Sequence, residues 1–352
     1  MFYRSLVRGK VARWSGGCYG PACERSFSHG EPMNLKDITI HFAHSAYQLS
    51  PLFERRETGI EHFQTWTIED TRARMGDAEV LIVSGVWNND MLPDAHRLKF
   101  IQVCGAGYDQ FDQDAIRAKG VRLANSSGVN VNAVSDHAMA LTLALTRKIH
   151  TGRDNQRARH WRGMISDLAQ REDELAGKTI VIFGLGKIGG RLARLAKAFE
   201  MTVIGVKRDT SAKVAHVDEL HAPDKFRDLL ARADVTALTC PLTPETHNLI
   251  DGAALAAMKP SAYLINVARG GCVDEPALIE ALQKNAIAGA GIDVTVQEPL
   301  AGDSPLWGFD NVVLTPHTGG ETTMYEDNVI DILLENLDRL SRGEETLRNQ
   351  VV

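Results

Sequence analysis

The sequence contains no uninterrupted apolar run of the ~18 residues that a membrane-spanning helix requires. Cysteine is scarce: there are five cysteines, they are scattered, and none are spaced as Cys-x-x-Cys. This argues against a disulfide framework or a structural zinc site and fits a reducing compartment. Positive charge is not in excess, since 45 acidic residues outnumber 39 basic ones and give a net charge of −6. We therefore expect a cytoplasmic protein with no membrane partner, no nucleic-acid partner and no metal.

Acidic residues are absent from the start of the chain. Residues 1–23 carry four basic side chains, no acidic one and no hydrophobic periodicity. An organelle transit peptide has similar features and stays an alternative. We favour an extension over residues 1–34 that is disordered or not native, because Met33 stands just before the first convincing strand. A chain that starts at Met33 should then fold and function unchanged.

What the sequence does contain is material for two domains. It has 352 residues, 44% of them hydrophobic, against a usual domain size of ~100–200 residues. Short runs of β-branched and apolar residues alternate with segments that place apolar residues at helical spacing. This alternation predicts an α/β protein with two doubly wound parallel-sheet domains. The predicted strands are 38–42, 80–84, 100–104 and 121–124 in the first series, and 179–183, 202–206, 235–239, 263–267, 288–294 and 312–314 in the second.

A long helical pattern over 133–149 separates the two series, and an Arg-rich segment continues from it to residue 174. Acidic residues are interleaved with the arginines, so we interpret the segment as a solvated or subunit-contacting arm rather than a nucleic-acid patch. The helix contains Ser135-Asp136-His137, the residue types of a serine-hydrolase triad. Adjacent helical residues point in different directions and cannot form a triad, so Ser135 is predicted to be a helix cap.

The strongest local motif is Gly184-Leu185-Gly186-Lys187-Ile188-Gly189, which follows a predicted strand and opens an amphipathic helix. In that context G-x-G-x-x-G is a dinucleotide-binding fingerprint. Gly184 allows a tight turn, Gly186 lets a pyrophosphate approach the backbone, and Gly189 allows close helix–strand packing. The helix N-terminus adds free N–H groups. We predict that these six residues bind NAD(P), the alternative being a glycine-rich turn without a ligand.

The next predicted strand ends in Lys207-Arg208. An NAD-preferring site places Asp or Glu there, ~20 residues after the glycines, to accept hydrogen bonds from the ribose 2′-OH. Two cations suit a 2′-phosphate instead, because Arg offers bidentate donors and Lys a point charge. We therefore predict that NADP(H) is preferred, with NAD(H) as the alternative cofactor. The opposing interpretation is that both side chains point into solvent.

Three polar side chains, Arg269, Glu298 and His317, follow the last three predicted strands. Ligands of open parallel sheets bind outside the carboxyl ends of the strands, so we expect the three to converge beside the glycine motif. Arg269 would hold a substrate carboxylate and polarise the neighbouring carbonyl. His317 would donate a proton while Glu298 orients its imidazole. The set predicts hydride transfer to a 2-keto acid.

Several motifs together resemble the D-isomer-specific 2-hydroxyacid dehydrogenase family. Besides the glycine motif they are Gly105-Ala106-Gly107-Tyr108-Asp109, Asn125-Ser126-Ser127-Gly128-Val129-Asn130, Cys240-Pro241-Leu242-Thr243-Pro244-Glu245-Thr246, the segment 266–275, the segment 293–300 and Thr315-Pro316-His317. The resemblance runs from residue 35 to the C-terminus.

The resemblance implies a particular domain arrangement and assembly. A Rossmann nucleotide domain over 128–317 would be inserted into a flavodoxin-like substrate domain formed by 35–127 and 318–352. The molecule would be a homodimer. Lys207-Arg208 departs from the NAD-linked members and resembles the NADPH-dependent glyoxylate/hydroxypyruvate reductase branch.

The resemblance also assigns roles to residues. It makes Arg269 the substrate-binding arginine, Glu298 with His317 the acid–base pair, and Asp293 a contact of the nicotinamide carboxamide. The backbone N–H groups of Gly105, Ala106 and Gly107 would bind the substrate carboxylate as an anion nest. The remaining cofactor contacts that it implies are Cys240, Pro241, Thr246, Val267 and Ala268.

We conclude from the sequence that the chain reduces a small 2-keto acid, such as glyoxylate or hydroxypyruvate, to a D-2-hydroxy acid with NADPH. One alternative is an NAD-linked dehydrogenase of another 2-hydroxy acid, such as 3-phosphoglycerate. Another, of a different class, is a dinucleotide-sensing binding module like the corepressor relatives of the family. Trp87 and Trp307 either line the pocket or pack in a core, a choice that the sequence leaves open.

Overall fold

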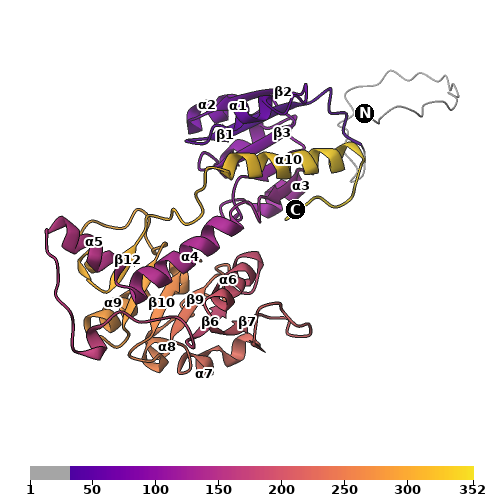
Figure 1. Cartoon of the computed structure of the whole chain (residues 1–352). Coiled ribbons are helices and arrows are strands. Elements are labelled where there is room, and N and C mark those ends of the chain that lie inside the picture. Colours follow the sequence, from indigo (N-terminus) through magenta and orange to yellow (C-terminus); the bar gives the residue numbers. More distant parts are fainter. Residues whose placement is uncertain (1–31) are drawn as a thin grey trace, which may run out of the picture.

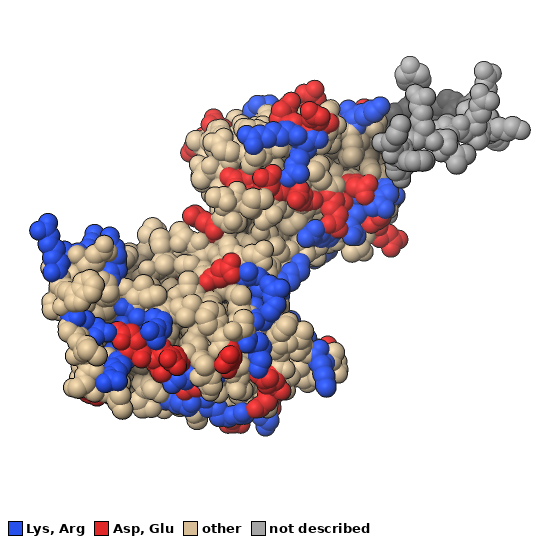
Figure 2. Space-filling view, in the orientation of Figure 1, with Lys and Arg blue, Asp and Glu red and all other residues tan. Residues whose placement is uncertain are grey.

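The computed structural model describes residues 32–352, which form two lobes, each built on a parallel β-sheet covered by helices (Figure 1). All but the last three residues of the expected extension over 1–34 lie outside the described residues. Within residues 32–352, no helix is long and apolar enough to cross a membrane. On the face in view in Figure 2, basic and acidic side chains are interspersed over both lobes.

The first lobe contains a five-stranded sheet with the order β2-β1-β3-β4-β5, all parallel. Its strands are rich in Val, Ile and Phe, whose branched and aromatic side chains pack well on a pleated surface. The strands are β1 (Thr39–His44), β2 (Glu61–Thr65), β3 (Val80–Ser84), β4 (Phe100–Val103) and β5 (Arg122–Asn125). The helices are α1 (Leu49–Glu54), α2 (Ile68–Ala73), α3 (Gln113–Ala118) and, from the end of the chain, α10 (Tyr325–Ser341).

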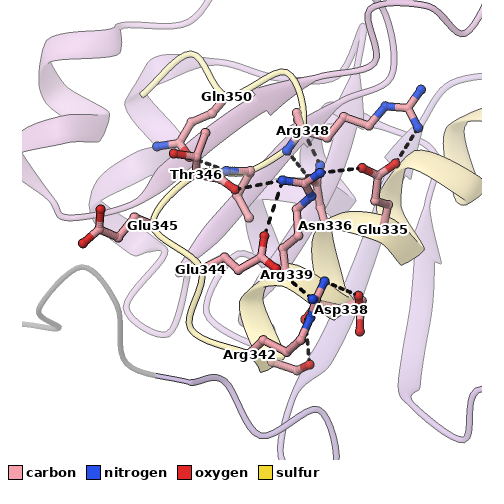
Figure 3. Close-up of polar contacts among 12 residues, drawn as sticks. Glu335, Asn336, Asp338, Arg339, Arg342, Glu344, Glu345, Thr346, Arg348 and Gln350 are labelled. Carbon is pink, nitrogen blue, oxygen red and sulfur yellow. Dashed lines mark hydrogen bonds and ion pairs between the residues drawn. The ribbon is translucent and has the colours of Figure 1, made fainter.

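Helix α10 returns from the C-terminal part of the chain to cover this first sheet (Figure 1). Its apolar face buries Val329, Ile330 and Leu333 in the same core cluster as Phe42 and Phe53. The residues after it pair with β5, where Val351 N donates to the Leu123 carbonyl at 2.7 Å. Figure 3 shows the ion pairs that surround the end of α10, including Arg339–Glu335 and Arg348–Glu335.

The second lobe contains a seven-stranded parallel sheet with the order β12-β11-β10-β9-β6-β7-β8. Helices cover both faces, and each face has its own buried apolar cluster. The strands are β6 (Thr179–Phe183), β7 (Thr202–Val206), β8 (Glu219–His221), β9 (Val235–Leu238), β10 (Tyr263–Asn266), β11 (Gly289–Ile292) and β12 (Val312–Leu314). The helices are α4 (Val131–Thr146), α5 (Ile149–Arg157), α6 (Lys187–Ala198), α7 (Phe226–Leu230), α8 (Gly252–Ala257) and α9 (Glu275–Gln283). The prediction of two doubly wound parallel sheets is confirmed.

Two local predictions were wrong. The single helix over 133–149 is two helices, because Lys148 adopts a left-handed conformation with φ 48° between α4 and α5. Ser135 is no cap: it lies inside α4, and its hydroxyl donates to the Val131 carbonyl at 2.6 Å. A serine hydroxyl that bonds the preceding turn can sit within a helix, which the sequence pattern does not reveal.

Candidate functional site

The glycine loop between β6 and α6 leaves no room for larger residues at two positions. Gly184 has φ +101°, and a Cβ built there would lie 2.8 Å from the Cys240 Cα. At Gly189 a Cβ would lie 2.2 Å from the Gly184 carbonyl oxygen, so α6 packs directly on the turn. Gly186, by contrast, has no atom within 4 Å of an added Cβ, and it caps the twelve-residue helix α6. The space beside Gly186, at the N-terminus of α6, is therefore open, which suits an approaching pyrophosphate.

The other residues of the glycine motif support the loop or line the cleft. The Lys187 ammonium donates to the Ser127 carbonyl at 3.1 Å, on the segment that links the two lobes. Leu185 packs against Gly205 of β7, and Ile188 lines the cavity between the lobes.

The predicted cofactor residues after β9 form a rigid turn. Thr246 Oγ1 donates to the Pro241 carbonyl at 2.7 Å and accepts from Thr243 N at 2.7 Å. The thiol of Cys240 is buried, and its hydrogen bond with Cys272 together with burial raises the pKa of Cys240. The turn therefore offers backbone to a ligand rather than a reactive thiolate.

Lys207 and Arg208 lie at the carboxyl end of β7, where the sequence predicts the residues that contact the 2′-position of the cofactor ribose. Lys207 is half-buried and Arg208 is exposed. Within the described part of the chain, neither side chain has a hydrogen-bond or ion-pair partner. The pKa of Glu245 is lowered mainly by hydrogen bonds from Thr243 and the backbone, and the nearby charge of Arg208 makes a smaller contribution. Lys207 likewise contributes, after the Ser211 hydrogen bonds, to the lowered pKa of Asp209. Neither cation is bonded to these carboxylates among the described residues, so both can contact an anionic ligand at this point.

His317 and Glu298 form a hydrogen-bonded pair at the ends of the last two strands. His317 Nδ1 lies 2.7 Å from Glu298 Oε2, and Glu298 Oε1 accepts from Thr295 N at 3.1 Å. The carboxylate therefore fixes the imidazole with Nδ1–H toward Glu298 and Nε2 free for another partner. His317 lines a cavity of about 410 Å³ whose walls come from both lobes.

Arg269 meets the first lobe across this cavity. Its Nη1 donates to the Ala268 carbonyl at 2.7 Å, which turns the guanidinium back toward the lobe interface. A Cβ built on Gly107 would lie 2.6 Å from Arg269 Nη2, so a larger residue there would push the guanidinium away from this loop. Gly105 and Ala106 lie on the same wall, and Val267 lies beside Arg269. The structure thus brings the predicted substrate residues together.

Asp293 lies beneath His317 and is 4% exposed. Burial would raise the pKa of Asp293, but hydrogen bonds from His137, Thr315 and the backbone of Gly319 hold it below its ordinary value. Thr315 Oγ1 donates to Asp293 at 2.7 Å, and the N–H groups of Thr318 and Gly319 donate at 3.0 Å. The carboxylate therefore stays charged at the floor of the cavity.

A second cavity, of about 520 Å³, lies on another side of His317 and is lined by Trp307, Leu300 and Pro316. Trp307 is therefore a pocket residue. Trp87 is not among the described residues that line either cavity: its ring stacks on Phe111 with centroids 5.1 Å apart.

Sequence reasoning missed several residues on the cavity walls. Tyr47, Asp109, Glu321 and Tyr325 line the cavity between the lobes, and His137 bonds the loop that carries His317. Arg269 and His317 were found because they directly follow strands, whereas Tyr47 and Asp109 lie further along the loops after β1 and β4, and Glu321 lies in the loop before α10. Tyr325 opens α10, so only the return of the C-terminus to the first lobe could have placed it here.

Comparisons with known proteins agree with this geometry. Residues 139–319 match the family model "D-isomer specific 2-hydroxyacid dehydrogenase, NAD binding domain". The glyoxylate/hydroxypyruvate reductase B of Pectobacterium carotovorum is 39% identical over 272 residues, 77% of this chain and 84% of that protein. The D-3-phosphoglycerate dehydrogenase of Methanocaldococcus jannaschii is 36% identical over 79% of this chain, which spans only 52% of that relative's length. An acyclic imino acid reductase solved with NADPH and D-Arg superposes with a TM-score of 0.77 at 26% identity, over 89% of this chain and 100% of that one.

Proposed function

Because the chain belongs to the D-isomer specific 2-hydroxyacid dehydrogenase family of oxidoreductases, we propose that it reduces a small 2-keto acid of the glyoxylate or hydroxypyruvate type to the D-2-hydroxy acid, with NADPH as preferred reductant. The observation that carries this is one cavity lined by both Arg269 and the Glu298-bound His317. The open start of α6 and the glycine turn fit a dinucleotide. When bound, that dinucleotide supplies the hydride.

The chain's own residues supply binding and the proton. The Arg269 guanidinium and the N–H groups of Gly105–Gly107 would hold the substrate carboxylate, a planar anion that suits a fork of donors. His317 would give its Nε2 proton to the carbonyl oxygen as that oxygen gains negative charge. Glu298 accepts the Nδ1–H, keeps the ring oriented and stabilises its protonated form.

The charges around the cavity support a small substrate with one anionic group. Among the described residues on its wall, Arg269 is the sole Lys or Arg, whereas Asp109, Glu321 and Asp293 are acidic. Arg269 is used by the 2-keto carboxylate, so a distal phosphate would meet carboxylates and no free cation. This charge balance favours glyoxylate or hydroxypyruvate over 3-phosphohydroxypyruvate.

The test is a matrix of initial rates for the purified full chain. NADPH or NADH is combined with glyoxylate, hydroxypyruvate, pyruvate, phenylpyruvate or 3-phosphohydroxypyruvate, and loss of the reduced cofactor is followed. We expect the highest kcat/KM with NADPH and glyoxylate or hydroxypyruvate. A preference for 3-phosphohydroxypyruvate with NADH would overturn both the substrate and the cofactor assignment.

We also propose that the molecule is a homodimer in which the arm over 149–174 contacts the second copy. Trp161 and Met164 in this arm are almost fully exposed, and Leu168 is largely exposed. Large apolar side chains exposed together mark contact surfaces. Sedimentation should show a dimer that the paired change Trp161→Ser with Met164→Ser weakens, and a monomeric wild type would contradict the proposal.

A further inference from the structure

The loop that carries His317 is held by a side chain that the proposed mechanism does not use. We propose that His137 is a positioning residue for His317: its Nε2–H donates to the Thr315 hydroxyl, which donates to Asp293, and this chain fixes the loop over 315–319. The inference rests on the proposed reductase function, in which His317 is the proton donor. His137 itself lies on α4, well before the motifs that contain the acid–base pair.

The directions of the hydrogen bonds follow from the charge on Asp293. Thr315 Oγ1 lies 2.7 Å from Asp293 Oδ1 and 2.8 Å from His137 Nε2. An ionised carboxylate only accepts, so the hydroxyl hydrogen of Thr315 must point to Asp293. The hydroxyl then offers only lone pairs to His137, and the imidazole must carry a proton on Nε2. The ring nitrogen also lies 3.4 Å from Asp293 Oδ1.

Asp293 accepts further hydrogen bonds from the backbone of the loop. Its carboxylate accepts from the N–H groups of Thr318 and Gly319, and its own carbonyl accepts from His317 N at 2.8 Å. Gly319 fits tightly in between, because an added Cβ would lie 2.6 Å from Asp293 Oδ2 and 3.0 Å from His137 Cδ2. His137 therefore packs against this loop from the α4 side.

This support matters because His317 has an uncommon backbone conformation. Its φ is +55°, in the left-handed region that residues other than glycine adopt infrequently. Without the donor from His137, Thr315 and Asp293 lose the hydrogen bond that ties this loop to α4. A catalytic group displaced by ~1 Å loses a rate factor on the order of 10².

Two substitutions separate positioning from simple packing. His137→Gln keeps an N–H donor near the Nε2 position, and His137→Leu removes it. We expect His137→Leu to lower kcat with glyoxylate and NADPH by about 10–100-fold, while the KM for glyoxylate, set by Arg269 and the Gly105–Gly107 loop, stays within about twofold. His137→Gln should restore most of kcat. His96→Leu is the control, because this histidine is exposed on the first lobe, is not among the described residues that line either cavity, and should leave kcat unchanged.

A measurement without substrate makes the inference independent of turnover. The Cε1–H resonance of His317 is assigned by its loss in His317→Asn and compared in the wild type, His137→Gln and His137→Leu. A single sharp resonance in the first two and a broadened or divided one in His137→Leu supports positioning. Equal losses of kcat in the Gln and Leu variants, or an unchanged His317 resonance in His137→Leu, would overturn it. If the wild type turns over no keto acid, the proposed function fails, and the resonances still decide the role of His137.

Discussion

At the scale of single residues, the proposed proton transfer depends most on the pair formed by His317 and Glu298. His317→Ala removes the proton donor and should lower kcat by about 10²–10⁴-fold. Glu298→Gln keeps a hydrogen-bond acceptor for Nδ1 but not the charge, so a smaller loss is expected. Steady-state rates with glyoxylate and NADPH measure both. A Glu298→Gln loss as large as that of His317→Ala would show that the carboxylate does more than orient and stabilise the ring.

Cofactor choice is a second prediction at this scale. Replacing Lys207 and Arg208 together by Gln removes the two unpaired cations at the end of β7. Even one hydrogen bond to a charged group contributes about 1.5–3 kcal/mol, so the KM for NADPH should rise by at least about 10–100-fold. The KM for NADH, which has no 2′-phosphate, should change little. Lys213→Gln, an exposed cation a few residues further along, is the matched control. An equal rise of the KM for NADPH and the KM for NADH would contradict a contact of these two cations with the 2′-phosphate.

His41 gives a pH dependence of stability that is independent of catalysis. It is buried, its Nε2 lies 2.7 Å from Thr65 Oγ1, and burial followed by the charge of Arg74 lowers the pKa of His41 to about 4. Unfolded His titrates near ~6.5, so the unfolded state binds the extra proton between these values and stability falls as pH drops through this window. His41 should remove about 2 kcal/mol of unfolding free energy between pH 7 and pH 5.

Urea unfolding at pH 7 and pH 5 measures this difference. His41→Gln cannot titrate in that range and keeps a polar group for Thr65, so its stability should change less between the two pH values. If the unfolding free energy depends on pH equally in the wild type and in the variant, His41 is not the group responsible.

At the scale of elements, the first turn of α6 contains two adjacent glycines with opposite surroundings. A Cβ on Gly189 collides with backbone, whereas one on Gly190 meets nothing within 4 Å. Gly189→Ala should cost about 1–3 kcal/mol through overpacking and weaken NADPH binding. Gly190→Ala lies within α6 and should stabilise by up to about 1 kcal/mol through helix propensity. Urea unfolding and quenching of NADPH fluorescence check both, and similar losses in the two variants would contradict the packing argument.

Most of the sheet could be predicted, because its central strands are buried on both faces and appear as apolar runs. Strands β2 and β8 could not be predicted. Each lies at a sheet edge, and the sequences EHFQT and ELH are mostly polar and only half-buried. The break after α4 was also invisible, because Lys148 in a left-handed conformation has no sequence signature comparable to glycine.

The candidate site was predictable to the extent that strand ends define it. Arg269, Glu298 and His317 follow consecutive strands of one sheet, and the carboxyl ends of parallel strands meet at one edge. Their roles remain predictions. The opposite wall, with Tyr47 and Tyr325, depends on how the two lobes face each other, which no local pattern encodes.

At the scale of the whole molecule, the site exists only because both lobes close around one cavity. Arg269 of the second lobe lies against Gly107 of the first, and Asn328 Nδ2 of α10 donates to the Val129 carbonyl on the connection between the lobes. The connecting segments therefore set the distance between the carboxylate loop and the proton donor.

The most direct test of the central claim is the product formed from hydroxypyruvate and NADPH by the full chain. The account predicts rapid loss of NADPH and glycerate of the D configuration, with both lost in His317→Ala. A tight complex with NADPH and no turnover of any keto acid would contradict the reductase and favour a dinucleotide-sensing binding module. Formation of L-glycerate would contradict the D configuration of the product that the proposed function takes from the family.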